Sequence, residues 1–145
     1  MDPVSAFSVV AGAAGLAVQC AGVAQKLYNL ASNFKNAELT IRCLADECDT
    51  IRLAWRRIEQ WTRDWADDVA ADIEVLERLN KSAATGSMIM TSLEEGISSL
   101  GIPSTPATFR RRAAVVWREN DLIAHRDRIR GMVAAVHVLL EVIKL

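Results

Sequence analysis

The chain has 145 residues, of which 51% are hydrophobic and 24% are charged, and its formal net charge is −1. This composition supplies enough apolar side chain for one folded domain, and it excludes the strong positive field with which proteins attract nucleic acid. We therefore predict a single helical domain over residues 1–145 that does not bind nucleic acid.

The first predicted helix, over residues 3–31, is the most apolar stretch of the chain. Asp2 and Pro3 are favourable residues at a helix start, and no charged side chain occurs from residue 3 to residue 25. A helix of this length matches the hydrocarbon core of a bilayer, which is about 30 Å thick. Two interpretations are open: the helix is the centre of a soluble bundle, or it enters a membrane.

Membrane entry would use the larger apolar side chains of this helix as the inserting groups. These are Val4, Phe7, Val9, Val10, Leu16 and Val18. Small residues repeated at a spacing of four allow a second helix to approach closely. Those that we single out for helix contact are Gly12, Gly15, Ala17 and Ala21.

Two further helices are predicted over residues 37–63 and 68–100, with a turn at 62–68 between them. The first of these two helices has apolar residues at alternating steps of three and four, which is typical of a bundle seam. The seam consists of Ile41, Leu44, Cys48, Ile51, Trp55 and Ile58. The seam expected for the second consists of Val69, Ile73, Leu76, Met90, Leu93, Ile97 and Leu100.

A last long helix is predicted from residue 119 onward. Gly101 and the prolines at 103 and 106 end the preceding helix, and residues 113–117 form a short apolar helical turn. The expected seam of the last helix is Leu122, Ile129, Val133, Val136, Leu140 and Ile143. Because no sustained alternation predicts a strand, we expect an all-α fold: a mostly antiparallel bundle of four long helices plus one short helix.

The chain lacks the signatures of enzymes and metal sites. It has no glycine-rich phosphate loop and no Cys-x-x-Cys. His125 and His137 lie on one helix and point about 120° apart at 100° per residue, so they cannot share a metal ion. We expect no catalytic site, no cofactor and no metal. Three cysteines, Cys20, Cys43 and Cys48, sit inside helical patterns, which favours a reducing compartment and free thiols that act as small apolar residues.

Tryptophans and a run of arginines are further candidates for membrane contact. Trp61 and Trp65 are candidate interface aromatics, because an indole ring favours one wet edge, whereas Trp55 belongs to the core seam. Arg110, Arg111 and Arg112 are candidate contacts to anionic head groups. The alternative for the arginines is ordinary solvated charge.

The two ends of the chain resemble one protein family. The opening Met1-Asp2-Pro3-Val4-Ser5, followed by the small-residue apolar helix, is similar to the N-terminal HeLo and HeLo-like domains of fungal STAND proteins, the fungal NOD-like receptors. The closing segment adds to the resemblance through Val115-Val116-Trp117, Glu119-Asn120-Asp121-Leu122, Ile129-Arg130-Gly131, Ala134-Ala135 and Leu139-Leu140.

The resemblance implies a helical bundle that executes cell death. Oligomerisation would release the first helix, matched here by Val4–Val23, which would then target and permeabilise the plasma membrane. The implied partners are anionic membrane lipids, further copies of the chain, and downstream nucleotide-binding or repeat domains. The implied location is the cytoplasm at rest and the plasma membrane after activation. The alternative is a soluble signalling or partner-interaction module in which the first helix stays permanently buried.

Overall fold

The computed structural model describes residues 6–32, 38–64, 73–98 and 119–142. These residues form four helices, α1 (Ala6–Ala31), α2 (Glu38–Asp64), α4 (Ile73–Ser98) and α6 (Glu119–Val142), and no strand occurs within the described ranges. The predicted all-α class is therefore confirmed. The short helix predicted at 113–117 lies outside these ranges and is not among the observed elements.

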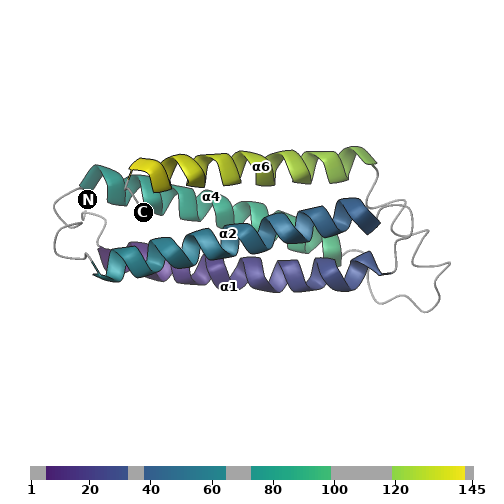
Figure 1. The fold of residues 1–145 in the computed structure, drawn as a ribbon, viewed down its shortest axis with the longest axis horizontal. Coiled ribbons are helices and arrows are strands. Elements are labelled where there is room, and N and C mark those ends of the chain that lie inside the picture. Colours follow the sequence, from purple (N-terminus) through teal and green to yellow (C-terminus); the bar gives the residue numbers. More distant parts are fainter. Residues whose placement is uncertain (1–5, 33–37, 65–72, 99–118, 143–145) are drawn as a thin grey trace.

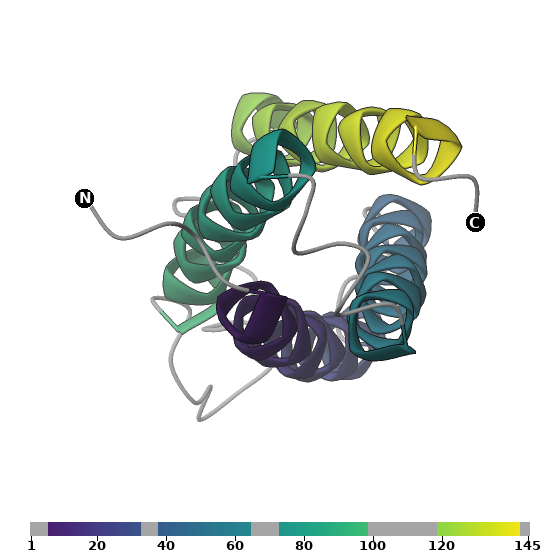
Figure 2. The ribbon, with the colours of Figure 1, turned by 90° about the vertical axis from the view of Figure 1, so that its left-hand side faces the viewer.

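The four helices lie side by side, and each runs in the direction opposite to the one before it in sequence (Figure 1). Seen end-on, α1 and α6 occupy opposite corners, and so do α2 and α4 (Figure 2). Accordingly, α1 packs against α2 and α4, and α6 packs against the same two helices. No helix occupies a central position, and each of the four has an outward face.

Side-chain contacts give the relative direction of neighbouring helices that are not consecutive. Gln19 of α1 bonds to Ser87 of α4, and further along both helices Lys26 pairs with Glu94. Residue numbers rise together along this pair, so α1 and α4 run parallel. The Glu47–Arg130 ion pair and the hollow shared by Ala54 and His137 give the same parallel direction for α2 and α6. The bundle thus combines antiparallel and parallel neighbours.

The seam of α2 forms the middle of the core, as its spacing predicts. All six predicted side chains are buried, and Trp55 is the largest of the fully buried ones. The turn predicted to begin at residue 62 is wrong for its first residues, because α2 continues to Asp64. Thr62 is buried there, and its hydroxyl donates to the carbonyl oxygen of Ile58 at 2.7 Å, which satisfies that polar group inside the helix.

The seams of α4 and α6 differ in part from those predicted. Leu76, Met90 and Leu93 of α4 are buried as expected, but Ile73 is exposed because it begins the helix at the rim of the bundle. In α6 the buried side chains are Ile129, Met132, Val136 and Leu139. Met132 and Leu139 therefore take the core positions predicted for Val133 and Leu140, which pack at the margin. The apolar positions of α6 are dense enough to allow either stripe.

At Gly86, side chains of two neighbouring helices lie close to the backbone of α4. A Cβ atom placed on Gly86 would lie 2.3 Å from Met132 Cε of α6 and 2.8 Å from Leu16 Cδ2 of α1. Both distances are far shorter than ordinary van der Waals contact, which is about 3.5–4.0 Å between carbon atoms. The missing side chain at this one position therefore allows α1 and α6 to contact α4 at the same level of the bundle.

Candidate functional site

The first helix carries more apolar surface than the core uses. Within the described ranges, α1 is the one helix long and apolar enough to cross a bilayer. Only 33% of its most apolar 18-residue window is buried in the bundle. A helix that is apolar on all sides usually lies in the interior of a large protein or in a membrane. Here it lies at a corner of the bundle, and packing of the described helices leaves one side of it uncovered (Figure 2).

The uncovered side of α1, which we call the outward face, has neither charge nor long polar side chains over its first turns. It consists of Phe7, Ala11, Gly15, Val18 and Gly22, all of them exposed. The relative exposure of Phe7 is 80%, and that of Val18 is 64%. The outer side of α2, by contrast, carries Arg42, Asp46, Arg56, Arg57 and Gln60. The outward face is therefore the candidate functional site, and its chemistry suits an apolar partner.

The side chains proposed to insert into a membrane do not form one surface in this bundle. Val9 and Leu16 are buried in the core, Val10 is half-buried, and Phe7 and Val18 point outward. Val4 lies outside the described residues. Lipid could contact all the described members of this set only after α1 has left the bundle.

The small residues proposed for helix contact also do not lie on one surface of the bundle. Gly12 faces α4, where a Cβ atom on it would lie 3.6 Å from Ala83 Cβ. Ala17 is buried and Ala21 is half-buried. A Cβ atom on Gly15 would have no neighbour within 4 Å. In the bundle Gly12 thus contributes to helix packing, while Gly15 belongs to the outward face.

The remaining candidates lie elsewhere. Trp61 of α2 is half-buried and packs against the margin of the core, so its side chain is partly exposed to solvent. Trp65 and the arginines Arg110, Arg111 and Arg112 lie outside the described residues.

Polar contacts tie the second half of α1 to the bundle. The Gln19 side chain donates to Thr91 Oγ1 at 2.9 Å and to the Ser87 carbonyl at 3.3 Å, and it accepts from Ser87 Oγ at 3.0 Å. Lys26 pairs with Glu94 at 3.0 Å. Gln19 was not among the residues predicted to have a role. It could have been recognised as one of only two glutamines in a stretch without charge, on the same side of the helix as Lys26.

Removing the Gln19 side chain is expected to loosen α1. The variant Gln19→Ala loses three hydrogen bonds to α4, each worth at least about 0.5 kcal/mol net, so hydrogen exchange of α1 amides should become at least about tenfold faster. The matched control is Gln25→Ala, because Gln25 bonds to Asn29 within α1 and reaches no other helix in that contact. Equal exchange rates in the two variants would contradict the assignment of Gln19 as a tie between α1 and α4.

Three weak acids at the α1–α2 contact have raised pKa values. Burial raises the pKa of the Cys20 thiol and of the Cys48 thiol to about 12. The hydrogen bond that Tyr28 donates to Asp46 raises the pKa of its phenol to about 12. The third cysteine, Cys43, is exposed and is not part of the core. Cys20 and Cys48 thus behave as small apolar residues, as the sequence predicts.

These shifts predict a loss of stability at alkaline pH. The unfolded chain releases protons from the two thiols near pH 9 and from the phenol near pH 10, while the folded chain retains them to about pH 12. The unfolded state therefore binds fewer protons, and the free energy of unfolding falls as pH rises from 9 to 12. Urea titrations at pH 7, 9 and 10.5 measure this, and Cys20→Ala/Cys48→Ala should flatten the slope. A slope that the double variant leaves unchanged would rule out the thiols as its source.

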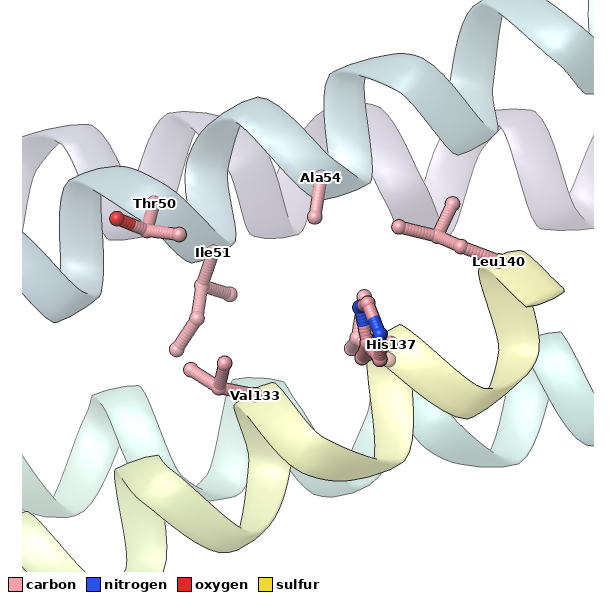
Figure 3. A pocket seen from close by; sticks show the side chains of 7 residues that line it. Thr50, Ile51, Ala54, Val133, His137 and Leu140 are labelled. Carbon is pink, nitrogen blue, oxygen red and sulfur yellow. The ribbon is translucent and has the colours of Figure 1, made fainter. Parts of the chain in front are cut away.

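His137 lines a hollow whose other described lining residues are mostly apolar. A hollow of about 100 Å³ between α2 and α6 is lined by Thr50, Ile51, Ala54, Val133, Val136, His137 and Leu140. Figure 3 shows the His137 ring directed from α6 toward α2, among apolar side chains. Among the described residues, no group of three or more His, Cys, Asp or Glu side chains is placed to hold a metal ion.

Comparisons of the chain with protein-family models, with curated proteins and with solved structures each find no match. The functional argument therefore depends on the site itself.

Proposed function

We propose that the chain is a non-enzymatic, membrane-targeting and oligomerising helical domain of the cell-death or innate-immunity type known from fungal STAND proteins. In the resting state that we propose, the helices form a closed, mostly antiparallel bundle in the cytoplasm. After activation, α1 leaves the bundle and permeabilises the plasma membrane. The observation that carries the proposal is an apolar helix of membrane-spanning length that is kept at a corner of the bundle with an uncharged face outward.

Release of α1 needs an apolar acceptor, because α1 holds a large part of the core. Its buried side chains include Val9, Leu16, Val23 and Leu27, and their partners on α2 would also become exposed. Exposure of a large aliphatic side chain to water costs about 1.5–3 kcal/mol. A bilayer removes this cost for α1, so the proposed opening depends on lipid.

Copies of α1 in a membrane can associate through their small residues. Gly12, Gly15, Ala17 and Ala21 would permit close contact between helices once α4 no longer covers part of this surface. Arg110, Arg111 and Arg112 would contact anionic head groups, and Trp61 and Trp65 would lie at the interface. Downstream nucleotide-binding or repeat domains would supply the trigger.

Labelling of Cys48 during vesicle permeabilisation tests the proposal. Cys48 is fully buried on α2 and close enough to Cys20 of α1 for that thiol to contribute, after burial, to the raised pKa of Cys48. In a Cys20→Ala/Cys43→Ser background, Cys48 is the one remaining thiol. Adding anionic liposomes should release an entrapped dye and should accelerate maleimide labelling of Cys48 at least tenfold, because departure of α1 uncovers it.

The matched control keeps Cys43 as the one thiol, through Cys20→Ala/Cys48→Ala. Cys43 is exposed at rest, so its labelling should be fast with and without vesicles. If a folded chain releases no dye and Cys48 stays protected, the alternative holds, and the chain is a soluble signalling module with α1 retained in the bundle.

A further inference from the structure

A groove between α4 and α6 combines an apolar floor with two arginines. Arg78, Ser82 and Thr85 line it from α4, and Arg128 lines it from α6. Its other lining residues are Gly86, Ile89, Gly131, Met132, Ala135 and Val136, and the volume is about 260 Å³. We call this the arginine groove. It lies between α4 and α6, and α6 is at the corner of the bundle opposite α1 (Figure 2).

Electrostatics in the arginine groove favour an anion. Two guanidinium groups and two hydroxyl groups line it, and no carboxylate occurs among the described lining residues. Arg78 and Arg128 are exposed, and no ion pair to either is found within the described ranges. Guanidinium groups bind phosphate through paired, charge-assisted hydrogen bonds. A phosphate monoester, with a charge near −2 at neutral pH, complements two arginines.

The groove adjoins a wider depression of mixed polarity. Arg78, Ser82 and Ala135 line both hollows, and the wider one, of about 820 Å³, is also lined by Val75, Val138 and Leu139. Val138 remains 60% exposed there. The charges that line this wider part balance, because Glu74 and Glu77 are accompanied there by Arg78 and Lys81.

We infer that the α4–α6 groove binds a single-chain lipid with a phosphate head, with the phosphate between Arg78 and Arg128 and the acyl chain along Val75, Val138 and Leu139. The arginine groove has a net positive charge and the wider part has balanced charges, so the phosphate head is favoured in the arginine groove. The site does not depend on release of α1, because both of its walls belong to α4 and α6. The inference therefore goes beyond the proposed function, and either one can fail without the other.

Calorimetric titration of the full chain with oleoyl lysophosphatidate, below its micelle concentration, tests the inference. Arg78→Gln/Arg128→Gln should weaken binding by at least tenfold, because charge-assisted contacts are lost on both walls. The control is Arg56→Gln/Arg57→Gln, which removes the same charge from the exposed side of α2 and should leave binding unchanged. Circular dichroism checks the fold of both variants.

Two control ligands distinguish the contribution of the phosphate head from that of the acyl chain. Inorganic phosphate has the head alone and oleoyl lysophosphatidylcholine has the same chain without net charge, so both should bind at least tenfold more weakly than lysophosphatidate. Amide shifts at Gly86, Gly131 and Ala135 should report the occupied groove. The inference is overturned if the Arg78/Arg128 variant binds as the unmodified chain does, if either control ligand binds equally well, or if the shifts occur on α1 instead.

Discussion

Replacing Trp55 by alanine is expected to lower the free energy of unfolding by about 3–5 kcal/mol, because a fully buried indole would leave a cavity that rigid helices cannot close. Trp55 has no exposed surface and lies in the middle of the α2 seam. Small domains are stable by only about 5–15 kcal/mol in total, so this loss is a large share of the stability. Urea denaturation followed by circular dichroism measures it.

Two further variants test whether the loss of stability comes from the buried position of Trp55. Trp61→Ala removes the same ring from the margin of the core, where it is half-buried, and should cost less than half as much. Trp55→Phe should also cost much less than alanine, since Trp55 Nε1 is buried without a hydrogen-bond partner and phenylalanine removes this unpaired donor. Similar losses at positions 55 and 61 would contradict the assignment of Trp55 as the centre of the core.

Replacing Phe7 and Val18 together by glutamate is expected to reduce binding to anionic vesicles by at least a hundredfold. Each apolar side chain contributes about 1.5–3 kcal/mol to transfer from water into an apolar medium, and each new carboxylate is repelled by anionic head groups. Both residues are exposed in the bundle, so the variant should fold normally. Leu16 is unsuitable for this test, because it is buried and a glutamate there would unfold the chain.

The matched control for the Phe7/Val18 variant is Leu39→Glu/Leu53→Glu. These leucines are 76% and 56% exposed, and both lie on α2, outside the candidate site. The control makes the same change in charge and removes a similar apolar area. Vesicle co-sedimentation should show binding close to that of the unmodified chain. If both double variants lose binding equally, the membrane contact is a general effect of surface charge and does not reside in the outward face of α1.

The sequence predicted α2 well and predicted α6 less well, for a physical reason. The polar residues of α2 leave one apolar stripe, so Ile41 to Ile58 could be assigned to the core from spacing alone. In α6, apolar residues lie on both sides of Met132 and Leu139, and two stripes one residue apart compete. In the folded bundle Met132 reaches the space beside Gly86 of α4, which favours the stripe that contains Met132.

The direction in which α1 faces could not be read from its sequence. A helix without charge from residue 3 to residue 25 offers no polar side that would identify the solvent-exposed face. The contacts of Gln19 and Lys26 with α4 fix its rotation, and these depend on partners nearly seventy residues away. The arginine groove is equally hidden, since Arg78 and Arg128 meet only through the packing of α4 against α6.

Gly86 has a consequence for the reversibility of any opening. The side chain of Leu16 occupies part of the space that a Cβ atom of Gly86 would need. When α1 departs, a cavity is left beside Gly86, which has no side chain to fill it. The remaining three helices would then have no equally dense alternative packing. We therefore expect α1 to repack into the bundle once it is no longer bound to the membrane.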